Sequence, residues 1–195
     1  MTVEFKELFP TTILTDENTD LANKMLPLCD RYISESTTNC LHTQKFPTTL
    51  YNRTQEANVN AEPLVQEFFN YISNRCLKSF LDYRKIGMPR EPRPFGFFNS
   101  MEKYAYLRKH NHLDCSFSGV FYLEVGDDVP PLIIYDSRPV RHFVSYPFQE
   151  INSRNEQLHV IYPKKGMILL WDSYLEHEVY QKLNDNPRKT FVFNI

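Results

Sequence analysis

The segment FSGVFYLE, residues 117–124, decides the fold of this chain. It is a short run of aromatic and aliphatic residues, as long as one β-strand, and turn-forming residues lie on both sides of it. Similar runs recur through the second half of the chain, where Gly, Pro, Asn and Asp separate them. The predicted strands are residues 104–112, 117–124, 132–136, 157–162, 167–171, 177–182 and 190–195. Seven or eight short strands joined by turns predict a jelly-roll or cupin-like β-barrel.

The first half of the chain has the residue spacing of helices. Asp16 or Asn18 can cap a helix that runs to about Ser34, because apolar side chains recur there every three or four residues. Pro27 lies inside this segment, so we expect a kink or a break in the helix at that point.

A second helix is expected from residues 60–63 to about Asp82, again with apolar residues along one side. Residues 35–62 are polar, and we expect them to form a long, partly ordered loop with one short strand. Both helices would cover one sheet of the barrel from outside.

Composition and charge indicate one globular α+β domain over residues 1–195, with a helical support region (1–95) and a jelly-roll core (96–195). Hydrophobic residues make up 42% of the chain and aromatic residues 14%, which is typical of a packed protein. The formal net charge of -2 gives no reason to expect nucleic acid or an anionic membrane as a partner. No apolar run reaches the length of a membrane span and the N-terminus lacks a signal-peptide pattern, so we expect a cytoplasmic protein.

Histidines in the second half of the chain have the spacing of metal ligands. His110, His112 and Asp114 are two residues apart, so a regular strand would point them to one side, and His177 opens a later predicted strand. A His-x-Asp pair with one distant His is the ligand set of a non-haem Fe(II) centre, which leaves metal positions open for a cosubstrate and dioxygen. We therefore prefer the set His112, Asp114 and His177. His110 is the alternative to Asp114 and would give three imidazole ligands.

An arginine near the end of the chain suits an anion beside this metal. Arg188 follows His177 by eleven residues, and Thr190 lies two positions further on, on the same side of the last predicted strand. A guanidinium can bind a carboxylate through two hydrogen bonds, and a hydroxyl can add a third. If Arg188 is buried it needs such an anion, because an unpaired buried charge is costly.

These residues make the chain resemble the 2-oxoglutarate- and Fe(II)-dependent oxygenases, and in particular a small bacterial and phage subgroup. The matching segments are HNH (110–112), SGVFY (118–122), the Gly-initiated strand that leads to a lone His (166–177) and RKTFVFN (188–194). The resemblance implies a double-stranded β-helix that binds Fe(II) through the triad and 2-oxoglutarate through Arg188 and Thr190.

The same resemblance implies that Tyr122 or Tyr104 donates a further hydrogen bond to the cosubstrate. In that subgroup a small residue is common at the position of Asp114, which is why His110 remains an alternative partner for His112. Thr190 stands where the subgroup usually has Ser, and a threonine keeps the hydroxyl.

We therefore expect an Fe(II)- and 2-oxoglutarate-dependent dioxygenase that hydroxylates a peptidyl or free amino acid, with prolyl hydroxylation as one example. The expected partners are 2-oxoglutarate and dioxygen, and the chain could form a homodimer. Two alternatives stay open, a cupin-type metal dioxygenase without 2-oxoglutarate and a catalytically silent jelly-roll binding module. Succinate production would separate the first from an oxygenase, and the absence of metal affinity would favour the second.

Overall fold

The helices lie in the first half of the chain and the strands other than the first follow them, in a computed structural model that describes residues 3–5, 9–40, 45–88, 90–138 and 149–195. The helices are α1 (Thr19–Ser34), α2 (Arg53–Ala61), α3 (Pro63–Tyr71), the π-helix η1 (Ile72–Leu77) and α4 (Lys78–Arg84). The strands are β1 (Ile13–Glu17), β2 (Phe95–Ser100), β3 (Leu107–His110), β4 (Phe117–Val125), β5 (Leu132–Tyr135), β6 (Leu158–Ile161), β7 (Met167–Asp172), β8 (His177–Val179) and β9 (Arg188–Asn194). None of the described helices is long and apolar enough to cross a membrane.

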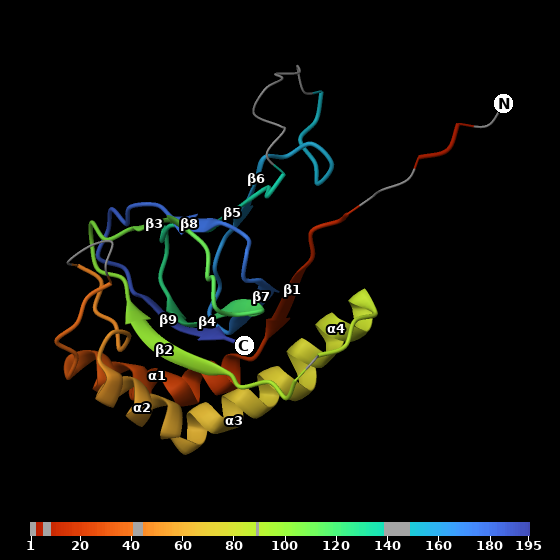
Figure 1. Cartoon of the computed structure of the whole chain (residues 1–195). Helices are drawn as coiled ribbons and strands as arrows, with labels where there is room; N and C mark the ends of the chain where they lie inside the picture. The colour runs from red at the N-terminus through yellow and green to blue at the C-terminus, as the bar shows by residue number, and fades with distance from the viewer. Residues whose placement is uncertain (1–2, 6–8, 41–44, 89, 139–148) are drawn as a thin grey trace.

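Two antiparallel sheets face each other, and the helices cover the outer face of the larger sheet (Figure 1). The larger sheet has the order β1-β7-β4-β9-β2 and the smaller sheet the order β3-β8-β5-β6. This arrangement confirms the expected α+β fold with a jelly-roll core and N-terminal supporting helices.

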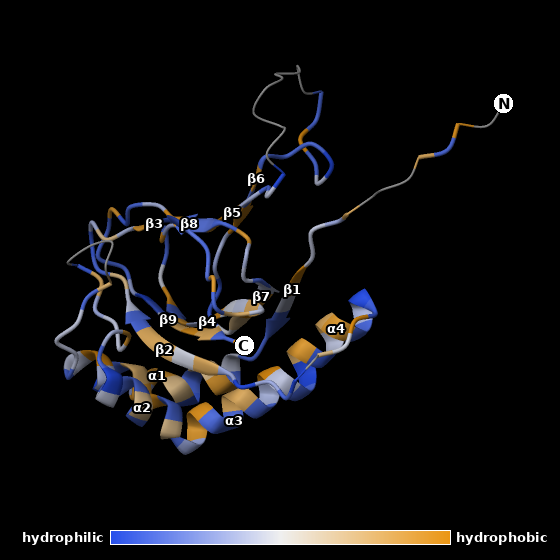
Figure 2. Ribbon diagram, in the orientation of Figure 1, coloured by the Kyte–Doolittle hydropathy of each residue, from blue (hydrophilic) through white to orange (hydrophobic). Residues whose placement is uncertain are grey.

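Side chains alternate between the two faces of the larger sheet, as the pleat of a strand requires. On β4, Phe121 packs toward the helices while Tyr122 belongs to the cluster between the sheets. On β9, Phe191 and Phe193 likewise pack among helix residues such as Phe68. Apolar colour accordingly runs along the strands of the larger sheet and in bands on the helices (Figure 2). The other face of each strand is thereby left for the inside of the barrel.

The first helix agrees with its sequence signals. The Asn18 side chain accepts a hydrogen bond from the backbone N–H of Leu21 at 3.0 Å and caps α1. Pro27 lies inside α1, which continues as one helix of 16 residues, so the chain does not break there.

The polar segment 35–62 contains a helix that the sequence pattern did not indicate. In α2 only Gln55 and Val59 are buried, so the segment has too short an apolar stripe to be recognised by periodicity. Asn52 caps α2 by accepting a hydrogen bond from the backbone N–H of Gln55 at 3.1 Å.

Two of the strand predictions need correction. The strand expected at residues 104–112 is limited to β3, because Tyr104 adopts a left-handed backbone conformation (φ 72°) that interrupts an extended chain. The strand β2 was absent from the predicted ranges, although it pairs with β9 and forms an edge of the larger sheet.

Gly119 of the SGVFY segment is required by close packing in the middle of the larger sheet. A Cβ atom at this position would lie 2.2 Å from the Phe193 ring and 2.5 Å from the Leu169 carbonyl oxygen. A ring carbon and a backbone oxygen cannot swing aside like the end of a flexible side chain, so the Phe193 ring and the β7 backbone would have to shift.

We therefore expect Gly119→Ala to lower the free energy of unfolding by about 2 kcal/mol through overpacking. Denaturant unfolding measures this change. Gly87→Ala is the matched control, because nothing lies within 4 Å of the Cβ it would add. Equal stabilities for the two variants would contradict this account of Gly119.

Candidate metal centre and cosubstrate pocket

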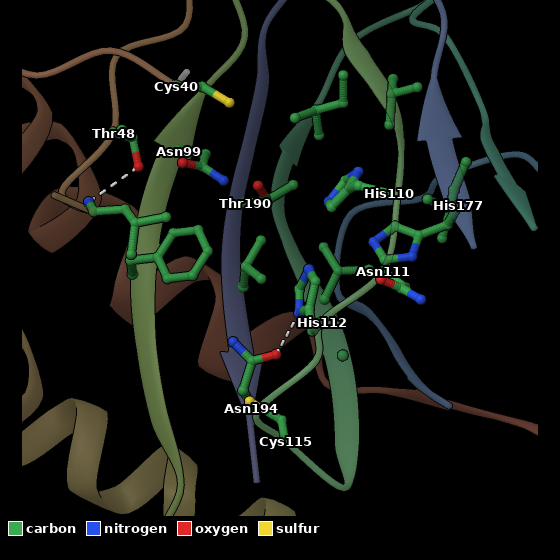
Figure 3. Close-up of a pocket in the computed structure, with 18 of the residues that line it drawn as sticks. Cys40, Thr48, Asn99, His110, Asn111, His112, Cys115, His177, Thr190 and Asn194 are labelled. Atoms are coloured by element: carbon green, nitrogen blue, oxygen red, sulfur yellow. Dashed lines mark hydrogen bonds between the residues drawn. The ribbon is translucent and has the colours of Figure 1, made fainter. Parts of the chain in front are cut away.

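Three histidine side chains meet between the two sheets. His110 and His177 are register partners on β3 and β8, and His112 follows β3 directly. The ring centroids are 4.4 Å apart for His110 and His177, 5.2 Å for His112 and His177, and 5.4 Å for His110 and His112. One ligating nitrogen of each ring lies within 4.8 Å of the other two. Figure 3 shows the three rings close together inside the pocket.

The Nδ1 atom of each ring is held by an oxygen atom of the protein. His110 Nδ1 lies 2.7 Å from the Arg108 carbonyl oxygen, and His177 Nδ1 lies 3.0 Å from the Leu175 carbonyl oxygen. His112 Nδ1 lies 2.6 Å from the Asn194 side-chain oxygen. A carbonyl oxygen only accepts, so Nδ1 carries the proton and the lone pair resides on Nε2. This tautomer is the one that a metal-binding histidine needs.

Burial keeps two of these rings neutral at physiological pH. His177 is 5% exposed, and burial together with the neighbouring His110 lowers its pKa from 6.5 to about 3. Burial also lowers the pKa of His112. Neutral imidazoles offer a lone pair to a metal ion without first losing a proton.

Asp114 does not join the histidines. It lies in an exposed turn after His112, and no group of potential ligands in the described part of the chain contains it. The regular strand that would have kept Asp114 on the side of His110 and His112 ends at His110. The geometry therefore favours the alternative set of His110, His112 and His177 over the set that includes Asp114.

The cosubstrate residues predicted on the last strand are buried in the same cavity. Arg188 is 3% exposed and Thr190 is 2% exposed, and both line the cavity together with Tyr122. Tyr122 is the register partner of Thr190, and the Arg188 guanidinium carbon lies 5.4 Å from the Tyr122 ring centroid. The Arg188 Nε atom and the Tyr122 hydroxyl are buried without a hydrogen-bond partner among the described residues.

A bulge in β4 keeps Glu124 from lying opposite Arg188. In an unbroken register after Tyr122, Glu124 would lie opposite Arg188, but the register shifts and Glu124 faces Lys189 instead. Lys189 Nζ lies 2.7 Å from Glu124 Oε2 and 2.8 Å from Asp30 Oδ1 of α1. The carboxylate of Glu124 is thereby neutralised on the helix side of the sheet, and no described ion pair neutralises Arg188. Burial lowers the pKa of Arg188, and the Tyr122 hydroxyl opposes this effect.

Tyr104, the other tyrosine expected at the cosubstrate, does not line this cavity. It is 50% exposed and lies in the turn before β3, where the ammonium groups of Lys45 and Lys103 are 5.1 and 5.4 Å from its ring centroid. Its left-handed backbone conformation directs it away from the path that a continuous strand would give.

The cavity has a volume of about 380 Å³ and extends from the histidines to β2 and the segment before α2. Residues from these regions line it although the sequence analysis did not single them out: Phe46, Thr48, Leu50, Phe97 and Asn99. Trp171 of β7, for which we expect a packing role, lines it as well. Asn99 Oδ1 and Trp171 Nε1 are buried without a partner among the described residues. Figure 3 shows Asn99 beside Thr190, its register partner on β9. A sequence signal for Phe97 and Asn99 would have required recognising β2 as a strand of the barrel.

The part of the chain that runs from β2 to β9 matches a known protein family. The profile of the 2OG-Fe(II) oxygenase family matches residues 97–194, which run from β2 to β9. The chain belongs to the 2OG-Fe(II) oxygenase family. It is therefore an Fe(II)- and 2-oxoglutarate-dependent oxygenase, and the family assignment favours this activity over a cupin without 2-oxoglutarate or a silent binding module. No curated protein matches the chain.

Solved structures share the fold of this oxygenase at low sequence identity. A Pseudomonas putida prolyl-4-hydroxylase superposes with a TM-score of 0.63 at 15% identity, covering 94% of this chain and 91% of that one. HygX from Streptomyces hygroscopicus, solved with nickel and 2-oxoglutarate bound, gives a TM-score of 0.61 at 14% identity, covering 94% and 83%. The α-ketoglutarate-dependent epimerase SnoN gives 0.60 at 10% identity, covering 94% and 76%.

The depressed pKa of His177 has a consequence for the stability of the metal-free oxygenase. Below pH 6.5 the unfolded chain takes up a proton on this residue, whereas the folded protein keeps it neutral down to about pH 3. The stability contributed by the neutral ring is therefore complete above pH 6.5 and decreases as the pH falls. We expect His177 to contribute a slope of up to about 1.4 kcal/mol per pH unit to the free energy of unfolding.

Denaturant unfolding of metal-free protein between pH 4 and pH 7 measures this slope. His177→Gln removes the titrating ring, so the variant should show a shallower pH dependence than the natural sequence. Identical slopes for the two proteins would mean that folding does not lower the pKa of His177.

Proposed function

We propose that His110, His112 and His177 are the three protein ligands of the Fe(II) ion. The arrangement of their Nδ1 contacts supports this set, because all three rings then offer Nε2 from neighbouring strands. A bond between a divalent metal ion and an imidazole nitrogen is about 2.1 Å long. Small rotations of the three side chains would therefore bring one nitrogen of each ring to bonding distance from a single ion. Three neutral ligands leave the ion its full positive charge for an anionic cosubstrate.

We further propose that Arg188, Thr190 and Tyr122 bind the carboxylate of 2-oxoglutarate that lies away from the metal. Arg188 supplies the positive charge and two N–H donors, and the two hydroxyls add hydrogen bonds. The carboxylate would also satisfy the buried Arg188 Nε and Tyr122 hydroxyl, which have no partner among the described residues. These orphaned polar groups in the same cavity as the three histidines are the observation that carries the proposal.

The protein residues then have three tasks in the reaction. The histidines and Arg188 orient the keto acid, the buried side chains Val120 and Trp171 keep bulk water from the cavity, and the remaining cavity receives the substrate. When bound, Fe(II) supplies the activation of dioxygen and the oxidation of the substrate, coupled to decarboxylation of 2-oxoglutarate to succinate.

We propose that the substrate is a peptidyl or free amino acid and that the reaction is a hydroxylation of one of its C–H bonds, as in prolyl hydroxylation. The fold shared with a prolyl-4-hydroxylase is consistent with this class. The cavity beyond Thr190 has apolar walls from Phe46, Leu50 and Phe97, which suit an aliphatic side chain, and Asn99 offers a polar contact. A screen of amino acids and blocked peptides for substrate-dependent succinate formation tests the class. Turnover only with compounds of another kind would contradict it.

The ligand set can be tested by comparing two single variants. We expect His110→Ala to reduce Fe(II) affinity more than about 100-fold, because loss of even an outer partner of a metal ligand costs about 10- to 100-fold. Asp114→Ala should bind Fe(II) like the natural sequence, since Asp114 lies in an exposed turn. Anaerobic equilibrium dialysis measures both affinities. The reverse order would assign Asp114, and not His110, to the metal.

The cosubstrate site can be tested by anaerobic titration of the Fe(II)-loaded protein with 2-oxoglutarate, which produces a visible metal-to-keto-acid charge-transfer band. We expect Arg188→Gln to weaken 2-oxoglutarate binding by about 2–4 kcal/mol, or roughly 30- to 1,000-fold, because a buried charge pair loses one partner. Fe(II) affinity should not change in this variant. Unchanged affinity for 2-oxoglutarate would exclude Arg188 from the site.

A further inference from the structure

His112 differs from the other two histidines in how its ring is held. His110 and His177 use carbonyl oxygens two residues back in their own segments. His112 instead contacts side chains from two other strands, Asn194 Oδ1 on β9 at 2.6 Å and Ser118 Oγ on β4 at 2.9 Å. Its orientation therefore depends on residues far away in the sequence. Both residues belong to the segments SGVFY and RKTFVFN, where no function had been assigned to them.

The hydrogen bonds around His112 form a network with a defined direction. Asn194 Oδ1 accepts from the Ser118 hydroxyl at 2.8 Å as well as from the histidine ring. Because the Ser118 proton is used in this bond, the hydroxyl of Ser173, 2.8 Å away, can donate to Ser118 Oγ. With Nδ1 of His112 protonated, each proton in this network has an acceptor. With Nδ1 unprotonated, Ser118 would donate to the ring, and the Asn194 oxygen would face the Nδ1 lone pair at 2.6 Å.

The network is shielded from water, which makes its direction hard to reverse. Ser118 is 0% exposed, Ser173 1% and Asn194 4%. In such surroundings a mismatched donor or acceptor is costly, because no water can replace the lost bond. The opposite tautomer of His112 would aim a lone pair at the Asn194 oxygen, so the network opposes it.

We propose that Asn194 and Ser118 are positioning residues that hold His112 in the Nδ1-protonated tautomer and so present Nε2 to the metal. The inference rests on the assignment of His112 as a ligand in the proposed function. Neither residue touches the metal or the substrate in this role. Both act through the ring of His112.

Ser173 connects the same network to the segment that carries His177. Its backbone carbonyl oxygen accepts a hydrogen bond from the backbone N–H of His112 at 3.0 Å, and its hydroxyl reaches Ser118. Ser173 lies in the turn between β7 and β8, four residues before His177. The network thus fixes two of the three ligand-bearing segments against each other before any metal binds.

The first test needs no metal and no variant. Nitrogen-15 NMR of the histidine rings in metal-free protein at pH 7.5 distinguishes the two neutral tautomers of His112. We expect the Nδ1-protonated form to dominate in the natural sequence. A dominant Nε2-protonated form would overturn the proposal, even if all three histidines bind metal.

The second test compares variants of Asn194, which is isosteric with Leu and Asp to a good approximation. Asn194→Leu removes the acceptor, so the Nε2-protonated tautomer of His112 should become populated and Co(II) affinity should fall about 10- to 100-fold. Asn194→Asp keeps an acceptor oxygen, so this variant should have the same His112 tautomer and the same Co(II) affinity as the natural sequence. Ser118→Ala leaves the Asn194 acceptor in place and should produce a smaller loss of Co(II) affinity in the same direction.

Val192→Thr is the matched control, because Val192 lies between Thr190 and Asn194 on β9 and lines the same cavity. It should leave the tautomer and Co(II) affinity unchanged. If Asn194→Leu lowers Co(II) affinity no more than Val192→Thr does, Asn194 is not a positioning residue. If the natural sequence binds no Co(II) while His112 has the expected tautomer, the ligand assignment fails and the positioning of the ring stands.

Discussion

The register between β4 and β9 is the constraint on which the rest of the site depends. These central strands of the larger sheet pair so that Ser118 lies opposite Asn194 and Tyr122 lies opposite Thr190. The first pair holds His112 and the second lines the pocket beside Arg188. A slip of β9 by one residue would turn Asn194 and Thr190 toward the helices and bring Phe191 and Phe193 into the cavity. The aromatic packing of the opposite face, centred on Phe68, therefore protects the chemistry of the inner face.

The bulge after Tyr122 changes this register at one end of the strand pair, with an electrostatic consequence. It directs Glu124 to Lys189, which also pairs with Asp30, so the sheet and α1 share an ion-pair cluster on the helix side. Arg188 is then the buried cation of the inner face, without an ion pair to any described residue. Under the proposed function the three neutral histidines, the metal and Arg188 give two separated positive centres. A dicarboxylate such as 2-oxoglutarate complements both of them, whereas a monocarboxylate complements one.

The sequence predicted the fold well where a short-range pattern determines the structure. The apolar runs of β4 and β7 and the Asn18 cap of α1 are such patterns, and the structure agrees with them closely. The helix α2 and the strand β2 were missed, because α2 buries only two residues and the turns around β2 are not marked by an obvious periodic pattern. Tyr104 shows a third limit, since a left-handed backbone position at a residue other than glycine leaves no trace in hydrophobic periodicity.

The ligand set shows why spacing alone leaves alternatives open. His110, His112 and Asp114 have the same parity, so a regular strand would present all three to the cavity. Only the point at which the strand ends distinguishes them, and β3 ends at His110. Hydrogen bonds from distant strands then keep His112 near His110, whereas Asp114 lies in an exposed turn at the wall of the cavity and outside the group of histidine nitrogens. The contacts that keep His112 beside His110 beyond the end of β3 come from Ser118 and Asn194, which lie 6 and 82 residues away from His112 in the sequence.

The helical layer contributes to the site through one ion pair as well as through packing. Arg84 at the end of α4 donates to Asp172 at 2.6 Å, and Asp172 ends β7 directly before Ser173. The Asp172 carbonyl oxygen also accepts a hydrogen bond from the backbone N–H of Leu175, which closes the turn leading to His177. The turn is therefore held from outside by Arg84 and from inside by the Ser118 network. Because two independent anchors act on one short segment, the spacing between His112 and His177 is set by the folded protein and does not have to be imposed by the metal.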